Sequence, residues 1–113
     1  MRAVEYNLKD PEFGAELVEL DAPDLPNGEW ARVAVTVGGI CGSDLHIVYM
    51  GWNAREFPLP HGYPGHEGLG EVVDGGGTDF HEGELVLTVP NIWSSRAFAD
   101  YQLIGPDFLV RLP

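Results

Sequence analysis

Glycine and proline occur along the whole sequence, and they limit the kinds of structure that it can form. The 113 residues include 15 glycines and 9 prolines, which favour many turns and leave little room for helix. Hydrophobic residues make up 44% of the chain, a proportion typical of a domain with a packed core. Because this length fits one domain of ordinary size, we expect a single, mainly β domain over residues 1–113.

Short stretches between these turns predict the strands. The clearest is WARVAVTVGG, in which Ala31, Val33, Val35 and Val37 alternate with residues that point the other way. The first two expected strands lie within residues 2–7 and 16–21. A turn-rich link at residues 8–15 joins them, and a loop at residues 22–29 follows the second. The other expected strands lie within residues 65–77, 83–90, 97–104 and 108–112.

The residues behind the clearest strand predict one or two helical turns, in the sequence SDLHIVYMG. Ser43 or Asp44 would cap the start of this helix, and Gly51 would end it. The next segment, NAREFPLPHGYPG at residues 53–65, contains three prolines and two glycines and predicts an irregular loop. A loop of this length in a small domain usually serves a function.

Acidic side chains outnumber basic ones by 18 to 6, which gives a formal net charge of -12. This charge repels phosphate backbones and anionic lipid headgroups, so we expect neither nucleic acid nor a membrane as a partner. An acidic soluble domain and an adaptation to high salt both fit this surface. The sequence starts without an apolar signal region and has no stretch of about 18 apolar residues, so we expect a cytoplasmic protein.

Within 27 positions the sequence holds six groups that a catalytic zinc site would need. A thiolate and an imidazole are common zinc ligands, and a carboxylate can be a third ligand or exchange with water. A nearby hydroxyl can relay a proton from a bound substrate. The six residues are Cys41, Ser43, Asp44, His46, His66 and Glu67.

Spacing alone leaves structural interpretations open for each of these residues. Cys41 fits a small buried side chain, Ser43 and Asp44 fit helix caps, and His66 with Glu67 fits an ordinary loop pair. The lone cysteine cannot form an internal disulfide, which agrees with a reducing compartment.

The other histidines and the nearby glycines complete this region. His46, His61 and His81 each fit an ordinary surface position. The clustered glycines predict close backbone approach around a site, and they are Gly38, Gly39, Gly65, Gly68 and Gly70.

Longer motifs resemble a known family. GICGSDLHIVYMG, followed by FPLPHGYPGHEGLGEVVDGG, resembles the catalytic-zinc region of the zinc-dependent medium-chain alcohol dehydrogenases. GELVLTVP, with Glu84 in place of the usual aspartate, AFADYQLI and FLVRLP are similar to later strands of the same family. The resemblance covers essentially the whole chain. It implies a GroES-like, partly open β-barrel with one or two short helical segments.

The resemblance also implies a role for each residue of the group. Cys41 and His66 match the zinc ligands, and Glu67 matches a carboxylate at or near the metal. Ser43 matches the hydroxyl that passes on the proton of the substrate. Two more roles follow in the same way: Asp44 matches an acid that orients the zinc-bound histidine, and His46 matches the residue that continues the relay towards solvent.

The implied activity is hydride transfer between a small alcohol, polyol or carbonyl compound and NAD(P). In this chemistry zinc lowers the pKa of the alcohol, so that a hydride can leave for the nicotinamide.

The sequence departs from the family pattern in two ways. It contains no G-x-G-x-x-G motif between a strand and a helix; GHEGLG comes close but matches the zinc-ligand segment. In the family, the Rossmann domain and a third zinc ligand follow the point where this sequence stops. A four-cysteine structural-zinc lobe is also absent, since only NIWSSR separates the flanking strands. We therefore expect one catalytic-type zinc site, no structural zinc, and NAD(P) only if a partner domain supplies its site.

Two functions remain open at this point. In the first, the chain is the zinc and substrate half of a dehydrogenase and is inactive by itself. It is either part of a longer protein or completed by a Rossmann-domain partner chain; a homo-oligomer is expected only for the second function. For the first function, an apolar face or a substrate cleft is expected, with Trp52, Trp93 and Tyr101 as candidates. In the second, it is a stand-alone GroES-like module that binds zinc or a small ligand without redox activity.

Overall fold

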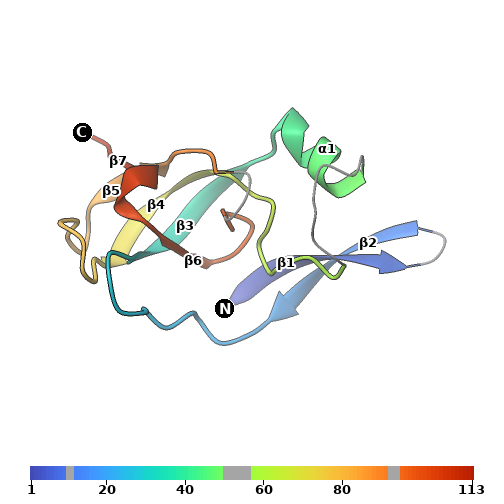
Figure 1. Cartoon of the computed structure of the whole chain (residues 1–113), viewed down its shortest axis with the longest axis horizontal. Helices are drawn as coiled ribbons and strands as arrows, with labels where there is room; N and C mark the ends of the chain where they lie inside the picture. The colour runs from blue at the N-terminus through green and yellow to red at the C-terminus, as the bar shows by residue number, and fades with distance from the viewer. Residues whose placement is uncertain (10–11, 50–56, 92–94) are drawn as a thin grey trace.

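The computed structural model describes residues 1–9, 12–49, 57–91 and 95–113 (Figure 1). Over these ranges most regular structure is strand, which confirms the predicted mainly β fold. In chain order the elements are β1 (Arg2–Lys9), β2 (Glu12–Glu19), β3 (Ala31–Gly39), α1 (Gly42–Tyr49), β4 (Glu67–Asp74), β5 (Leu85–Thr88), β6 (Tyr101–Ile104), the 3-10 turn η1 (Pro106–Phe108) and β7 (Leu109–Arg111).

The first two strands form an antiparallel hairpin that reaches farther than the sequence predicted. Its register runs from Arg2 opposite Glu19 to Lys9 opposite Glu12. Strand pairing therefore continues into residues 8–15, where we expected a turn-rich link. The reason is that cross-strand hydrogen bonds and side-chain contacts override weak local preferences for turns.

The remaining strands form one antiparallel sheet in the order β6-β3-β4-β5-β7. β6 and β7 are its two ends, and no pairing joins them in the described part of the chain. The sheet is therefore open at these edges, which agrees with the expected partly open barrel. One face encloses the main core, which consists of Ala31, Val33, Val72, Phe80, Val86, Ile104 and Leu109.

The alternation predicted along β3 holds only in its first half. Val33 is fully buried, but the side chain of Val37 is 58% exposed. Val35 pairs with Gly70 and Val37 pairs with Leu69, so the register shifts between them. The predicted alternation therefore fails at Val37, which lies beyond this irregularity and near the end of β3.

The strand predictions after β3 were correct in position and too long in extent. β4, β5, β6 and β7 each lie within their predicted segment. The segment before β6 contributes only a single bridge, between Ala3 and Ala99. The predicted loop at residues 22–29 is irregular in the structure.

A second, smaller core holds the helix and the long loop in place. It consists of Ile47, Val48, Leu59 and Tyr63, with Tyr6 and Phe57 packed against it. Helix α1 lies beyond the end of the sheet, near the β1–β2 hairpin (Figure 1). The loop residues 57–65 contain no helix or strand, as predicted, whereas residues 53–56 and the expected helix stop Gly51 lie outside the described residues.

No described helix is long and apolar enough to cross a membrane.

Candidate metal centre

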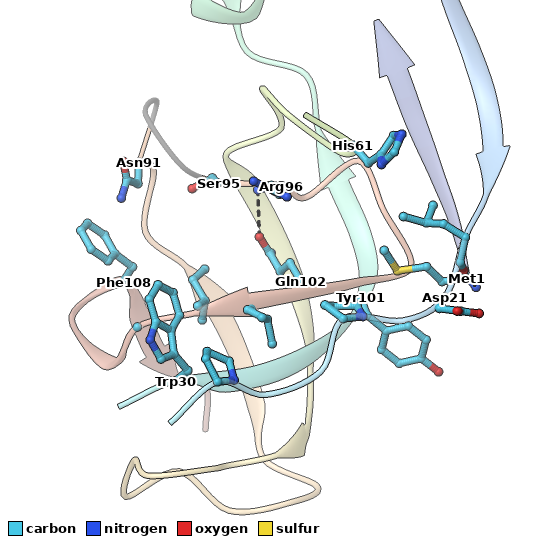
Figure 2. Close-up of a pocket in the computed structure, with 16 residues that line it drawn as sticks. Met1, Asp21, Trp30, His61, Asn91, Ser95, Arg96, Tyr101, Gln102 and Phe108 are labelled. Carbon is cyan, nitrogen blue, oxygen red and sulfur yellow. Dashed lines mark hydrogen bonds between the residues drawn. The ribbon is translucent and has the colours of Figure 1, made fainter. Parts of the chain in front are cut away.

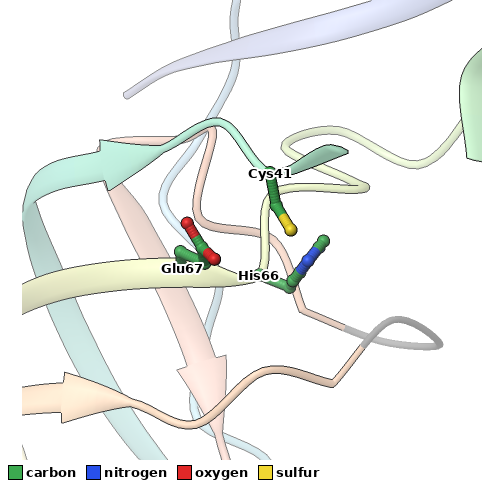
Figure 3. Close-up of side chains that lie close together, drawn as sticks. All are labelled: Cys41, His66 and Glu67. Atoms are coloured by element: carbon green, nitrogen blue, oxygen red, sulfur yellow. The ribbon is translucent and has the colours of Figure 1, made fainter. Parts of the chain in front are cut away.

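Strand pairing brings the three predicted metal ligands together from distant parts of the sequence. Cys41 follows β3 and precedes α1, while Glu67 begins β4 and His66 immediately precedes it. Gly39 of β3 pairs directly with Glu67 of β4. As a result, the ligand atoms of Cys41, His66 and Glu67 all lie within 4.8 Å of one another (Figure 3).

The glycines around this site are required by space, as their clustering predicted. A Cβ on Gly39 would lie 2.8 Å from Oε2 of Glu67, and one on Gly65 would lie 2.7 Å from the Phe98 backbone nitrogen. A Cβ on Gly70 would lie 2.3 Å from the carbonyl oxygen of Ala34. Larger residues at these positions would push the strands or the ligands apart.

Ser43 contacts two of the three ligands. Its Oγ lies 2.9 Å from Nε2 of His66. The hydroxyl donates a hydrogen bond to Sγ of Cys41, at 3.3 Å. Because α1 begins at Gly42, the first helical turn aims this hydroxyl at the ligand group. The serine hydroxyl therefore lies beside two of the three candidate ligands.

The ring of His66 is fixed by its other nitrogen. His66 is only 2% exposed, and its Nδ1 lies 2.8 Å from the carbonyl oxygen of Pro64, to which it donates. Oδ1 of Asp44 lies 3.0 Å from the same Nδ1 but makes no hydrogen bond among the described residues. Nδ1 therefore has two oxygen partners within 3.0 Å, the Pro64 carbonyl, which accepts its hydrogen bond, and the Asp44 carboxylate, which forms an ion pair when the ring is protonated. This arrangement leaves Nε2 as the nitrogen that faces the other ligands.

The sequence pointed to Asp44 and missed the carbonyl of Pro64, since a backbone oxygen has no side-chain signature. Asp44 has a second contact, because its Oδ2 accepts a hydrogen bond of 2.9 Å from the backbone N–H of Cys41. Asp44 lies in the first turn of α1, so its carboxylate reaches back to cap the helix start. Burial raises the pKa of Asp44, partly offset by the hydrogen bond from Cys41.

The same contacts bias the protonation of the other groups. Hydrogen bonds from the side chain and backbone of Ser43, followed by the one with His66, lower the pKa of the Cys41 thiol. Burial lowers the pKa of His66, but the Pro64 carbonyl, Cys41 and Asp44 together outweigh it and raise that pKa. The thiolate form of Cys41, which is the form that binds metals, is thus favoured.

The donor set fits a zinc ion. It offers one sulfur, one imidazole nitrogen and one carboxylate oxygen, and all three donor types are usual for zinc. Three protein ligands with a fourth position open are typical of catalytic zinc sites. Glu67 is exposed, so its carboxylate is free to move towards or away from a metal.

Among the described residues, the other histidines and Tyr101 are not part of the ligand group. His46 is half-buried on α1, one turn beyond Ser43. Nε2 of His61 pairs with Oε2 of Glu5 at 2.8 Å and ties the long loop to β1. His81 is exposed, as its surface interpretation predicted. Trp52 and Trp93 lie outside the described residues, and Tyr101 is half-buried on β6.

The fold and the site together define a class: a partly open β-barrel domain with a thiolate, imidazole and carboxylate group at the rim of its sheet. Residues 27–113 match the family described as the alcohol dehydrogenase GroES-like domain. The chain belongs to this family.

Three relatives show the breadth of the likeness. L-threonine 3-dehydrogenase of Pyrococcus furiosus is 44% identical over 91 residues, which are 79% of this chain and 26% of the relative. Galactitol-1-phosphate dehydrogenase from Escherichia coli has the same fold, with a TM-score of 0.81 and 23% identity over 100% of this chain and 38% of its own. Glucose dehydrogenase from Haloferax mediterranei, in complex with NADP, Zn and gluconolactone, has a TM-score of 0.77 and is 21% identical. That match covers 100% of this chain and 39% of the glucose dehydrogenase chain.

The chain thus spans about a quarter of the length of the curated relative that it matches.

Proposed function

We propose that this chain is the zinc and substrate domain of a dehydrogenase that transfers a hydride between a small alcohol or polyol and NAD(P). The observation that carries the proposal is the gathering of Cys41, His66 and Glu67 ligand atoms within 4.8 Å. Family membership and the dehydrogenase names of the relatives support the reaction class. The zinc in the glucose dehydrogenase complex supports the choice of metal.

Cys41, His66 and Glu67 would hold the zinc, which supplies Lewis-acid chemistry that lowers the pKa of a bound hydroxyl. The chain's own residues prepare the site for it. The carbonyl of Pro64 favours the proton of His66 on Nδ1, so the lone pair of Nε2 would be available to a metal. Asp44 holds the backbone of Cys41 and thereby fixes the position of the thiolate.

Ser43 is the residue that we assign to proton transfer. Its Oγ contacts both Cys41 Sγ and His66 Nε2, so it lies within reach of a substrate hydroxyl at the metal position. His46 lies three residues later on the same helix face and would pass the proton on towards solvent.

The nicotinamide cofactor needs a second domain. The described sheets are antiparallel throughout, whereas dinucleotide sites of the Rossmann type are built on a parallel sheet. We propose that a nucleotide-binding domain of the Rossmann type completes the active site. Without that domain, the chain described here would bind the metal but would not turn over substrate.

A cobalt titration of the metal-free protein tests the metal site. We expect a thiolate charge-transfer band and the visible bands of a four-coordinate ion, both saturating at one equivalent. Cys41→Ser should abolish the charge-transfer band and His66→Ala should weaken binding strongly, while the exposed control His81→Ala should bind like the wild type. Binding that survives in both ligand variants would refute the assigned site. A metal bound as expected, but with no activity after a nucleotide-binding domain is supplied, would favour the module without redox activity.

A further inference from the structure

Thr88 ends β5 and carries a buried hydroxyl that is not part of the ligand group. It is only 2% exposed, and along β5 it lies two residues after Val86, so both side chains point to the core face of the sheet. A buried hydroxyl is unfavourable unless it forms hydrogen bonds. Thr88 satisfies this requirement with a single residue, Gly68 of β4.

The hydroxyl of Thr88 makes two hydrogen bonds to the backbone of Gly68. Its Oγ1 accepts one of 2.9 Å from the Gly68 N–H and donates one of 3.2 Å to the Gly68 carbonyl oxygen. The two residues lie directly opposite each other in the pairing of β4 with β5. The side chain therefore joins the two strands at the point where β5 ends.

Gly68 directly follows two of the candidate metal ligands, His66 and Glu67. The N–H of Gly68 belongs to the planar peptide group that joins it to Glu67, so a bond to this N–H restricts the backbone of Glu67. On the opposite side, Glu67 pairs with Gly39 of β3. The backbone that carries the carboxylate is thus held by β3 on one side and by Thr88 of β5 on the other.

The space around Gly68 is filled, which keeps this contact in place. A Cβ on Gly68 would lie 3.0 Å from Oγ1 of Thr88, 3.3 Å from Cβ of Ala97 and 3.5 Å from Nε2 of Gln102. Gln102 is itself fixed, because its Oε1 accepts a hydrogen bond of 3.1 Å from the backbone N–H of Arg96 (Figure 2). Only glycine at position 68 lets the hydroxyl approach the backbone this closely.

From this geometry we propose that Thr88 is a positioning residue for the metal centre. Its hydroxyl holds the backbone at Gly68 and thereby sets where the carboxylate of Glu67 and the adjacent imidazole of His66 meet a metal. This role rests on the proposed function, because it requires a metal at the assigned ligands. Polar groups that support metal ligands from behind commonly tune metal affinity.

Thr88→Val tests this role, since valine keeps the shape of the side chain and removes the hydroxyl. Cobalt affinity, measured by competition with a chelator, should fall about tenfold, within the range typical of lost supporting contacts at metal sites. The visible bands of bound cobalt should shift, because they report ligand geometry, and the thiolate charge-transfer band should remain. Thr88→Ser keeps the hydroxyl and should bind cobalt like the wild type, with wild-type visible bands.

Thr78 provides a matched control for this substitution. Its Oγ1 donates a hydrogen bond of 2.6 Å to the carbonyl oxygen of Gly75 and accepts one of 3.2 Å from the N–H of Phe80, so it makes the same pair of backbone contacts in a turn after β4. Thr78→Val should lower the unfolding temperature and leave cobalt affinity and spectrum unchanged. A merely structural role for Thr88 would give that same pattern.

Gly68→Ala disturbs the contact from the other strand. Its added Cβ would lie 3.0 Å from Oγ1 of Thr88 and would push the hydroxyl away from the backbone. This variant should also weaken cobalt binding, and it tests the role independently of whether Thr88→Val folds.

Wild-type cobalt affinity and visible bands in folded Thr88→Val or Gly68→Ala would overturn the role of Thr88 and leave the proposed function intact. A loss in Thr88→Val that Thr88→Ser also shows would overturn it too, because the hydroxyl would not be the cause. Failure of both Thr88→Val and Gly68→Ala to fold would assign Thr88 to sheet stability instead. If the wild type itself bound no cobalt, the proposed function would fail, and the role of Thr88 with it.

Discussion

Oγ of Ser43 lies 2.9 Å from Nε2 of His66, the ring nitrogen that faces the other two ligands. The two residues come from α1 and from the start of β4, and neither element alone would place them together. Their contact links the group assigned to proton transfer with the group assigned to metal binding.

The hydroxyl of Ser43 should control the acidity of Cys41. Its hydrogen bond is the main cause that lowers the pKa of this thiol. Ser43→Ala should therefore raise the pKa of Cys41 in the metal-free protein, and the pH profile of iodoacetamide alkylation should move to higher pH. The variant should still bind one equivalent of cobalt. An unchanged alkylation profile would show that Ser43 does not stabilise the thiolate.

Gly39 should be necessary for metal affinity rather than for folding. A Cβ at this position would lie 2.8 Å from Oε2 of Glu67, and the flexible carboxylate would swing away from it. Gly39→Ala should weaken metal binding, as measured by competition with a chelator, and leave thermal unfolding nearly unchanged.

The matched control for this substitution is Gly42→Ala. A Cβ on Gly42 meets nothing within 4 Å, and this residue begins α1. Gly42→Ala should bind metal like the wild type. Equal affinity in both alanine variants would remove Glu67 from the ligand set.

Glu84 should make stability depend on pH. Its Oε1 accepts a hydrogen bond from the backbone N–H of His81, and its Oε2 accepts a hydrogen bond from the side chain of Arg111. These contacts lower the pKa of Glu84 below the usual value of 4.5. The ionised form is thus favoured in the folded state, so its stabilising contribution is complete above pH 4.5 and is lost as the pH falls through the folded pKa.

Thermal unfolding over a pH series measures this contribution. Glu84→Gln should unfold at a lower temperature than the wild type at pH 7, and the difference should shrink in acid. A difference that stays constant with pH would show that the carboxylate charge is not involved.

Two valines of β3 should differ sharply in their contribution to stability. Val33 is fully buried in the main core, whereas Val37 is 58% exposed. Val33→Ala should lower the free energy of unfolding by about 1.5–3 kcal/mol, and Val37→Ala should change it by less than about 0.5 kcal/mol. Urea denaturation measures both. Similar losses in the two variants would contradict the register shift in β3.

Much of the fold could be predicted because its signals are local. The alternation of WARVAVTVGG predicted β3, and the prolines and glycines of residues 57–65 predicted an irregular loop. The candidate ligands were also recognisable, since thiol, imidazole and carboxylate groups follow from residue type. Their roles rested on the resemblance, because spacing alone left structural interpretations open for each residue.

Other features could not be predicted because they depend on contacts between distant residues. The extended pairing of β1 with β2 overrode a local turn signal. The register shift between Val35 and Val37 depends on the pairing of β3 with β4.

The sequence by itself determined the mainly β class, the family and the identity of the candidate ligands, because residue type and short motifs carry that information. Packing in three dimensions was needed to pair Gly39 with Glu67 and to place the Pro64 carbonyl, next to the Asp44 carboxylate, against Nδ1 of His66. Backbone carbonyls and strand registers have no signature in the sequence. Their positions are set when the whole sheet packs around its core.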